Sequence, residues 1–268
     1  MPSWYSSLFG VQKPVIGMLH LLPLPGSPGF AGDWEAVRTR LMEDVQALAS
    51  GGVHALMIEN FGDAPFFPRR VPRATVAFMT ALAADVRRAT TLPLGINVLR
   101  NDGVSGVAIA AAVGAQFIRV NVLCGARVTD QGVIDGIAHK LLRERAALAA
   151  RGVRIFADVS VKHSAPLGSP RPIEDEVADT LHRGGADALV VSGSGTGRPT
   201  DPELVRRVKA AAGDAPVLVG SGVDTETLPE LAPLADGFIV GTSLKVGGKS
   251  SAPIDPPRVR AFMQGLRA

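Results

Sequence analysis

The sequence predicts a (β/α)8 TIM barrel, and two observations support that prediction. Eight short apolar runs recur along the chain of 268 residues, and a segment with the apolar spacing of a helix follows each run. Such alternation is typical of a parallel sheet with helices outside it. A length of 268 residues is ordinary for one closed barrel. Since no shift in composition marks a boundary, we expect residues 1–268 to form a single domain.

The composition is typical of a globular protein that does not span a membrane. Hydrophobic residues make up 46% of the chain and charged residues 20%. No apolar run reaches the ~18 residues of a transmembrane helix, and residues 1–10 lack the pattern of a signal peptide. Cys124 is the single cysteine, so we expect neither an intrachain disulfide nor a Cys-based zinc site, and we predict a cytoplasmic location. The net charge is only +3, so nucleic acid is not an expected partner.

In the first half of the chain, each predicted strand is followed by a predicted helix. Val15 to Leu19 is the first strand, and a loop rich in Pro and Gly separates it from a helix that Asp33 caps and Gly51-Gly52 ends. A polar loop at residues 123–132 precedes the fourth helix. We expect the remaining strands of this half at residues 55–59, 94–98 and 117–121, and their helices at about 76–86, 103–113 and 134–150.

The second half repeats this alternation. We expect strands at residues 154–159, 188–192, 217–220 and 237–241, and helices at about 173–183, 202–212 and 257–266, with a short helix between the last two strands. An open Rossmann-type sheet is the alternative. Its G-x-G-x-x-G fingerprint belongs in the first strand–helix turn, which here reads HLLPLPGSPG. The Gly-rich turns come late in this chain, and this favours the barrel.

Two Gly-rich turns end the last two predicted strands and suggest a phosphate site. Gly220-Ser221-Gly222 follows the seventh strand, and Gly241-Thr242-Ser243 follows the eighth. Glycine lets backbone N–H groups approach an anion closely. Barrels of this class usually build a phosphate site from these two loops and a short extra helix, which Ser243-Leu244-Lys245 could begin. The alternative is that these glycines only make tight turns.

Polar residues lie at the carboxyl ends of the otherwise apolar strands. In a TIM barrel these ends face one mouth, where functional groups are found. A charged side chain inside a barrel must be paired or must face a ligand. The candidates are His20, Glu59, Asn60, Asn97, Arg119, Asn121, Asp158, Lys162, His163 and Ser192.

Glu59 and Asp158 are the two carboxylates among these candidates, and several chemistries are open to them. Either is a candidate general acid or base, and together they could stabilise a cationic sugar-like transition state. Together, or with His20 or His163, they could hold a divalent metal. The alternative is that a neighbouring cation, such as Arg119 or Lys162, neutralises each of them and serves the structure.

The loops after the fifth and sixth strands add further candidates. Lys162 lies a few residues beyond the strand, so we expect contact with a substrate phosphate or carboxylate rather than covalent catalysis through a Schiff base. His163 is a candidate proton donor or acceptor. The run from Ser192 to Gly197 could cradle a second anion or form a mobile lid, but its spacing around Ser194 does not match a G-x-S-x-G nucleophile elbow.

Eight stretches of this sequence carry a family resemblance. They are VIGMLHLLPLPGSP, GGVHALMIENFGDAPF, LGINVLRND, FIRVNVLCGARVTDQG, FADVSVKHSAPL, GGADALVVSGSGTG, PVLVGSGV and DGFIVGTSLKVGG. In this order and spacing, over about residues 14–265, they closely resemble the BtpA family, named for a photosystem I biogenesis protein. The resemblance implies a TIM barrel of the ribulose-phosphate-binding kind. It links the namesake to stabilising photosystem I, whereas other members look like enzymes of sugar metabolism, and it transfers no set of catalytic residues.

Two functions of different kinds follow from these observations. The first is an enzyme of lyase, isomerase or hydrolase type that acts on a small phosphorylated ligand, sugar phosphate or nucleotide-like, through Glu59 and Asp158. No organic cofactor is indicated, and a divalent metal stays an alternative. The second is a non-catalytic assembly or stability factor of the photosystem I biogenesis type. A homo-oligomer is compatible with both, and the polar residues at the barrel mouth favour the enzyme.

Overall fold

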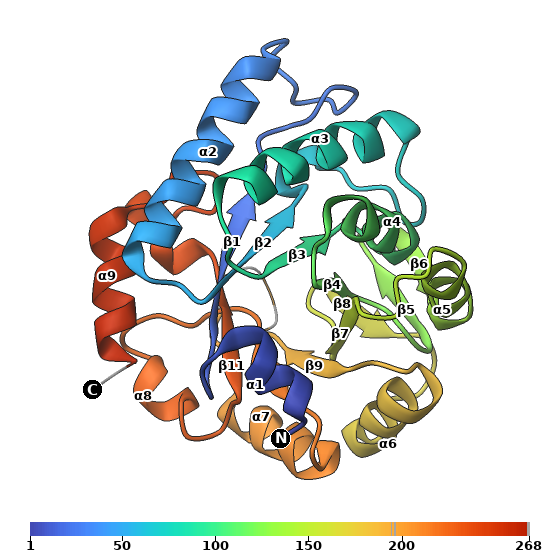
Figure 1. The fold of residues 1–268 in the computed structure, drawn as a ribbon. Coiled ribbons are helices and arrows are strands. Elements are labelled where there is room, and N and C mark those ends of the chain that lie inside the picture. The colour runs from blue at the N-terminus through green and yellow to red at the C-terminus, as the bar shows by residue number, and fades with distance from the viewer. Residues whose placement is uncertain (194, 196, 267–268) are drawn as a thin grey trace.

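A closed barrel of parallel strands organises the molecule (Figure 1). The computed structural model describes residues 1–193, 195 and 197–266. Its barrel strands are β1 (Val15–His20), β2 (Ala55–Glu59), β3 (Leu94–Asn97), β4 (Phe117–Val120), β7 (Arg154–Val159), β9 (Ala188–Val191), β10 (Val217–Val219) and β11 (Gly237–Val240). Within the described residues they pair in the order β1-β11-β10-β9-β7-β4-β3-β2 and close on themselves. Each strand lies within one residue of its predicted bounds, so the predicted TIM barrel is confirmed.

Helices surround the barrel and connect successive strands (Figure 1). They are α2 (Trp34–Gly51), α3 (Arg73–Ala89), α4 (Gly103–Val113), α5 (Ala138–Ala147), α6 (Ile173–Ala178) with the π-helical turn η2 (Asp179–Arg183), α7 (Pro202–Ala212), α8 (Leu228–Leu231) and α9 (Pro256–Gly265). Three 3-10 turns are η1 (Phe61–Asp63), η3 (Thr242–Leu244) and η4 (Val246–Gly248). Asp33 caps α2 as predicted, because its carboxylate accepts the N–H of Ala36 at 2.9 Å. In the described part of the chain, each helix is too short or too polar to cross a membrane.

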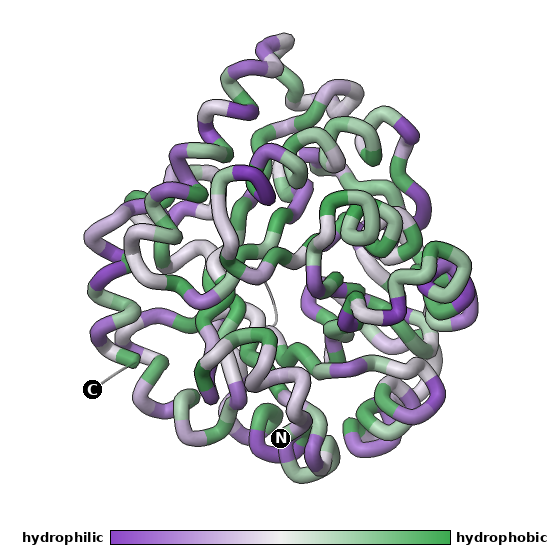
Figure 2. Tube along the Cα trace, viewed as in Figure 1, coloured by the Kyte–Doolittle hydropathy of each residue, from purple (hydrophilic) through white to green (hydrophobic). Residues whose placement is uncertain are grey.

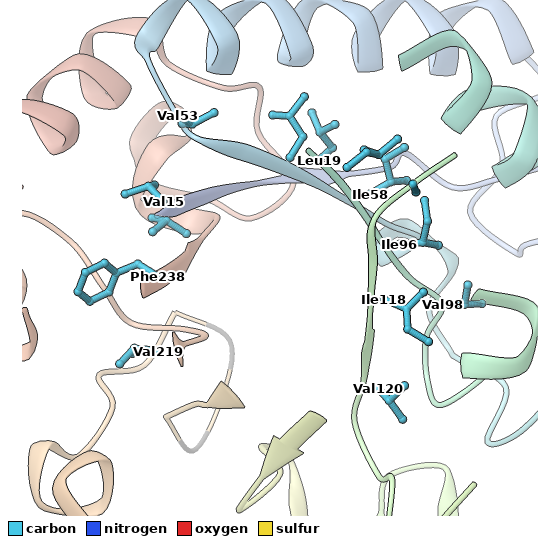
Figure 3. Packing of buried hydrophobic residues seen from close by; sticks show 14 of the residues in the cluster. Val15, Leu19, Val53, Ile58, Ile96, Val98, Ile118, Val120, Val219 and Phe238 are labelled. Carbon is cyan, nitrogen blue, oxygen red and sulfur yellow. The ribbon is translucent and has the colours of Figure 1, made fainter. Parts of the chain in front are cut away.

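Alternation along the strands separates two apolar regions. Successive side chains of a strand point to opposite faces. Outward residues such as Val15, Leu19 and Ile58 pack in one large cluster with the surrounding helices (Figure 3). Inward residues such as Met57 and Phe156 fill the barrel interior. The hydropathy of the chain follows this arrangement, since the barrel strands are mostly apolar and the outer helices alternate between polar and apolar residues (Figure 2).

A short helix that the sequence analysis did not predict packs against the barrel interior. α1 (Ser3–Phe9) buries Tyr5 and Phe9 in the interior cluster, where the Phe9 ring lies 6.1 Å from that of Phe117. The Tyr5 hydroxyl donates to the carbonyl oxygen of Asp236, the residue before β11, at 2.8 Å. Seven residues are too few for a helix to be stable alone. Aromatic packing against the barrel therefore stabilises α1.

The segment after β4 corrects one prediction. In place of a loop and a helix from residue 134, β5 (Ala126–Thr129) and β6 (Gly132–Asp135) form an antiparallel hairpin, and α5 begins only at Ala138. β8 (Ser164–Pro166), from the loop after β7, pairs with the other edge of β5. Ile134 is buried in β6 with Val122 and Val161. Its apolar side chain, which fitted the start of a helix, anchors this small sheet.

Candidate active site

Strand alternation also turns polar side chains into the mouth of the barrel. Five candidate residues each lie two positions beyond a side chain of the interior cluster, and they therefore point inward as well. These five are His20, Glu59, Arg119, Asp158 and Ser192.

A cavity of about 230 Å³ opens at this mouth. Four of the predicted polar residues line it, namely His20, Glu59, Arg119 and Lys162. The loops after β10 and β11 form another part of its wall. They contribute all six residues predicted to bind phosphate, namely Gly220, Ser221, Gly222, Gly241, Thr242 and Ser243.

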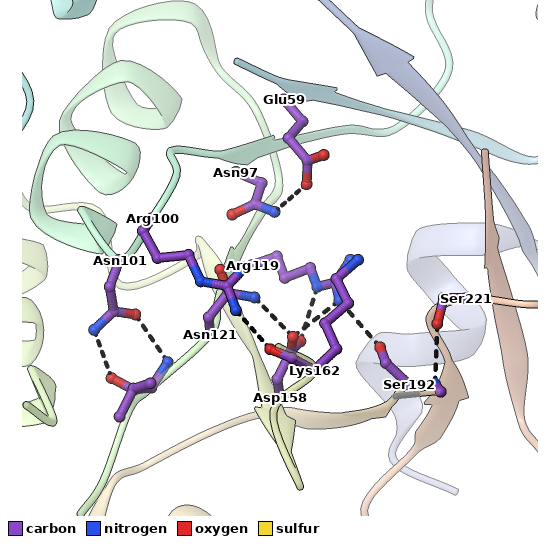
Figure 4. A network of polar contacts seen from close by, with 12 residues as sticks. Glu59, Asn97, Arg100, Asn101, Arg119, Asn121, Asp158, Lys162, Ser192 and Ser221 are labelled. Atoms are coloured by element: carbon purple, nitrogen blue, oxygen red, sulfur yellow. Dashed lines mark hydrogen bonds and ion pairs between the residues drawn. The ribbon is translucent and has the colours of Figure 1, made fainter. Parts of the chain in front are cut away.

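Glu59 is held in place by its neighbours on both sides. Asn97 Nδ2 donates to Glu59 Oε1 at 2.6 Å (Figure 4). Glu59 Oε2 lies 3.6 Å from Nε2 of His20. The carboxylate is only 6% exposed. Asn97, predicted to bind substrate, therefore orients a buried carboxylate that keeps one oxygen for a ligand.

The imidazole of His20 is neutral, and a backbone carbonyl determines its tautomer. Nδ1 lies 3.2 Å from the carbonyl oxygen of Ser250, and since a carbonyl only accepts, the proton is on Nδ1. Nε2 then carries a lone pair on the side of Glu59. The ring stacks on Phe61, with ring centroids 4.4 Å apart. Burial lowers the pKa of His20 to about 4, although the charge of Glu59 opposes this effect.

This lowered pKa predicts a loss of stability in acid. The unfolded chain, with a histidine pKa of 6.5, binds more protons than the folded chain between pH 6.5 and pH 4. Stability is therefore complete above that window and falls as the pH falls through it, by up to roughly 3 kcal/mol. In urea titrations, the free energy of unfolding of the wild type should fall by that much more than that of His20→Gln. The exposed His139→Gln variant should follow the wild type, and an equal fall in His20→Gln would contradict a buried neutral ring.

Asp158 does not line the cavity, which corrects its expected placement. Arg119 donates from Nε to Asp158 Oδ1 at 2.8 Å and from Nη2 to Oδ2 at 2.9 Å, so the ion pair is bidentate (Figure 4). Asn121 Nδ2 donates to the same Oδ2 at 2.7 Å. The Asp158 side chain is 0% exposed. Asp158 thus neutralises a buried cation, as the structural alternative expected, and Asn121 supports this pair.

Arg119 reaches from β4 across the mouth toward β9 and β10. Its Nη2 also donates to Ser192 Oγ at 3.3 Å. A Cβ at position 220 would lie 3.3 Å from this nitrogen and 2.4 Å from Val190 Cγ1, so Gly220 allows the close approach. Burial lowers the pKa of Arg119, but the charge of Asp158, its hydrogen bonds and the charge of Glu59 together outweigh burial and raise the pKa, so the group stays a cation. Ser192, predicted to bind substrate, orients this guanidinium.

The backbone amides of the two Gly-rich loops are not equivalent. The N–H of Gly220 donates to the carbonyl oxygen of Val191 at 2.7 Å, as part of the hydrogen bonding between β10 and β9. The prediction that this N–H binds the anion is therefore wrong. Ser221 Oγ accepts the N–H of Gly193 at 3.0 Å (Figure 4), which connects this loop to the one after β9. Candidate anion donors are the other amides of these loops, those of Ser221, Gly222, Gly241, Thr242 and Ser243.

The two loops are also connected to each other. Ser243 Oγ, at the start of η3, donates to the carbonyl oxygen of Val223 at 2.6 Å. Gly222 has a φ of +65°, and a Cβ there would lie 2.0 Å from the carbonyl oxygen of Arg198. Only glycine fits this position, so a larger residue would disturb the loops as a whole.

Lys162 follows β7 and lines the cavity. Its side chain stands beside the Arg119 guanidinium (Figure 4). Within the described residues, its ammonium makes no hydrogen bond or ion pair. Burial lowers the pKa of Lys162, and the charge of Arg119 lowers it further. The guanidinium of Arg100 is buried nearby and donates from Nη2 to the carbonyl oxygen of Lys162 at 2.6 Å.

Two other predicted residues lie away from the cavity. Asn60 Oδ1 accepts the N–H of Leu99 at 2.7 Å, so this buried side chain connects the loops after β2 and β3. His163, a predicted acid–base group, is exposed, has a φ of 54° and does not line the cavity. Ser194 and Thr196 of the predicted anion loop or lid lie outside the described residues.

Some residues of the site were not predicted because they do not end a barrel strand. Arg258, in the first turn of α9, lines the cavity, and its Nη1 lies 3.4 Å from the carbonyl oxygen of Ser243. Asp224 lines the cavity as well. Lys245 lies behind the cavity, where it is fully buried, donates to the carbonyl oxygen of Ala252 at 3.1 Å and has a pKa that burial lowers to about 8. The only signal for Arg258 in the sequence is a basic residue early in the last predicted helix.

The described residues at this mouth do not form a set of metal ligands. In residues 1–193, 195 and 197–266, no group of three or more His, Cys, Asp or Glu side chains is placed to hold a metal ion. Asp158, one of the proposed ligands, is bound to Arg119 instead.

Comparison with known proteins places the chain in a family. The model of the BtpA family matches residues 11–268. The chain belongs to the BtpA family. This BtpA-family chain is 47% identical over 258 residues to the photosystem I biogenesis protein BtpA of Synechocystis sp., covering 96% of this chain and 89% of the relative. It is also 47% identical to an uncharacterized protein of Thermococcus kodakarensis, covering 94% of this chain and 95% of the relative.

Solved structures share the fold of this BtpA-family chain. N-(5'-phosphoribosyl)anthranilate isomerase from Pyrococcus furiosus matches with a TM-score of 0.59 at 14% identity, over 95% of this chain and 98% of the isomerase. Tryptophan synthase from M. tuberculosis matches with a TM-score of 0.60 at 19% identity, over 98% of this chain and 94% of that chain. At such identities the similarity shows the fold alone, and it confirms the fold that the family resemblance implied.

Proposed function

We propose that this protein is an enzyme that transfers a proton on a small sugar phosphate bound in the mouth of the barrel. One observation carries this proposal. A single cavity joins the Gly-rich loops after β10 and β11 to the carboxylate of Glu59 and the imidazole of His20.

The Gly-rich loops are the phosphate end of the proposed site. η3 begins at the cavity, and the first amides of a helical turn have no partner within the helix, so they can bind an anion. Arg258 adds a cation at the same wall. The structurally similar isomerase from P. furiosus is named for a phosphoribosyl compound, which supports a phosphorylated ligand here.

Glu59 and His20 are the reactive end. Glu59 Oε2 and His20 Nε2 lie 3.6 Å apart, and the lone pair of the neutral imidazole is on this side. The carboxylate of Glu59 acts as the base that removes a substrate proton. His20 Nε2 accepts a hydrogen bond from a substrate hydroxyl or relays the proton. Because Arg119 binds Asp158, this pair replaces the earlier pair of Glu59 and Asp158. The reaction is then of isomerase or lyase type rather than two-carboxylate glycoside hydrolysis.

The size of the cavity selects among phosphorylated ligands. Its volume of about 230 Å³ is below the roughly 300–1,000 Å³ of pockets for drug-sized molecules. A sugar phosphate therefore fits better than a nucleotide-like compound.

Inorganic phosphate should stabilise the protein, and a negative charge at Thr242 should abolish this effect. At about 100 times its Kd, phosphate should add about 2.7 kcal/mol, which raises the Tm by roughly 5–10 °C for a chain of this size. In Thr242→Glu the carboxylate repels or replaces the anion, so the shift should disappear in a thermal melt. Thr242→Gln is the matched control, since it has the same length without the charge, and it should keep most of the shift.

The outcome at Thr242 separates the phosphate site from a general salt effect. A phosphate shift that persists in Thr242→Glu would contradict binding by these loops. Gly222 is not suited to this test, because a side chain there meets the backbone of Arg198.

A non-catalytic role is the second candidate, favoured by the 47% identity to a protein named for photosystem I biogenesis. The two candidates differ in what they require of Glu59. A strain that lacks this protein and receives the Glu59→Gln variant should keep its defect if the function is catalytic. Full rescue by Glu59→Gln would favour the assembly role.

A further inference from the structure

We infer that the substrate carries a carboxylate as well as its phosphate, and that Lys162 binds this carboxylate. The inference rests on the proposed function for the phosphate end of the ligand. It identifies the substrate as a phosphorylated hydroxy acid or sugar acid.

The Lys162 ammonium has no counter-ion of its own among the described residues. The charged groups that act on it are the cations Arg100 and Arg119 and the carboxylates Glu59 and Asp158. Arg119 is paired with Asp158, and Arg100 donates to the carbonyl oxygen of Lys162 and has the charge of Asp130 acting on it as well. His20 is neutral because its pKa is lowered to about 4. Lys162 is therefore the cation of this group that is left to bind a ligand.

Neither of the two carboxylates that act on Lys162 pairs with it. Both oxygens of Asp158 accept from Arg119. Glu59 Oε1 accepts from Asn97 at 2.6 Å, on the β3 side of the mouth. Among the described residues, none pairs with the Lys162 ammonium. A partly buried cation without a partner is unfavourable, and an incoming anion relieves that penalty.

Lys162 lies on the same side of the barrel mouth as the phosphate loops. Lys162 follows β7, and β9 separates β7 from β10 in the barrel. A ligand whose phosphate lies on the loops after β10 and β11 therefore extends its other end toward Lys162 and Arg119. Arg119 uses Nε and Nη2 for Asp158 and Ser192, and its Nη1 makes no hydrogen bond to a described residue. An ammonium beside a guanidinium N–H is a suitable pair of donors for a carboxylate.

The charge also distinguishes a carboxylate from a second phosphate. A carboxylate brings one negative charge, which matches the one ammonium of Lys162. A phosphate monoester brings about −1.5 to −2, and a second such group would have to share a cavity of about 230 Å³ with the first. One phosphate and one carboxylate satisfy both the charge and the volume.

The test compares two ligands that differ only at the end expected to contact Lys162. 3-Phosphoglycerate and sn-glycerol 3-phosphate have the same phosphate, the same secondary hydroxyl and the same chain length, but one ends in a carboxylate and the other in a hydroxymethyl group. Calorimetric titration of the wild type should give on the order of 10- to 100-fold tighter binding for 3-phosphoglycerate. Equal affinities would overturn the inference even if inorganic phosphate binds.

The variant Lys162→Met tests whether the Lys162 side chain causes the tighter binding of 3-phosphoglycerate. It removes a cation that pairs with none of the described residues, so the fold should be retained. The affinity for 3-phosphoglycerate should fall to that for glycerol 3-phosphate, while inorganic phosphate should bind as before. Lys140→Met, an exposed lysine on α5, is the control for the loss of one charge and should keep the preference. If the preference persists in Lys162→Met, or if that variant loses inorganic phosphate as well, Lys162 is not the carboxylate ligand. If neither ester nor inorganic phosphate binds the wild type, the proposed function fails together with this inference.

Discussion

Replacing Asp158 by Ala should destabilise the protein by roughly 3–5 kcal/mol, the usual effect of removing one partner from a buried ion pair. The variant would leave the Arg119 guanidinium buried without its counter-ion, and Asn121 would lose its acceptor. For a chain of this size the Tm should fall by roughly 6–20 °C. The isosteric Asp158→Asn should also be destabilised, because the shape is kept but the charge is not. Denaturant titration at neutral pH measures both.

An exposed pair of the same composition is the control for this prediction. Asp135 binds Arg69 at 3.0 Å, but the two side chains are 58% and 74% exposed. Asp135→Ala should therefore change the stability by less than about 1 kcal/mol. If Asp158→Ala were equally mild, the pair with Arg119 would not be closed in solution, and Asp158 would return as a candidate for proton transfer.

Replacing Glu59 by Gln should reduce turnover by roughly 100- to 10,000-fold, the usual contribution of a general acid or base. The amide oxygen of Gln can still accept from Asn97, so the fold and the phosphate site should be preserved. The measurement is kcat on a phosphorylated sugar acid that the wild type converts, together with the Tm shift caused by phosphate in the same variant. A normal kcat in Glu59→Gln would exclude the carboxylate as the base.

The positions of the strands could be predicted because each is a short apolar run with an abrupt end. Val217 to Val219 stops at Gly220, and the run from residue 237 to 240 stops at Gly241. A parallel strand is buried on both faces and is therefore a near-continuous apolar run, which the sequence shows directly. The closed barrel then follows from counting the runs.

The small sheet of β5, β6 and β8 could not be predicted in the same way. β5 has only four residues, and none of them is fully buried. Its pairing with β8 joins residues such as Arg127 and Pro166, which are far apart in the sequence. Such pairing depends on tertiary contacts and not on local periodicity.

Sequence position predicted which side chains gather at the mouth but not how they pair. Glu59 and Asp158 look alike in the sequence, since each is a carboxylate at an inward position near a strand end. The neighbouring strands make the difference. Glu59 is in register with His20 on β1 and with Asn97 on β3, whereas Asp158 is on β7, next to the strand that carries Arg119. Because neighbouring strands of a barrel are known once the fold is predicted, the contacts of Glu59 with His20 and Asn97 and of Asp158 with Arg119 follow from the order of the strands.

The contact between α1 and the far end of the chain has a consequence for biosynthesis. Tyr5 and its acceptor, the carbonyl of Asp236, are 231 positions apart. At ~5–20 residues per second, a ribosome needs ~10–45 s to add the chain between them. During that time the aromatic side chains of α1 have emerged but their final site does not yet exist. The nascent protein thus carries an exposed aromatic segment that holdase chaperones can bind until β11 has been translated and the barrel can close.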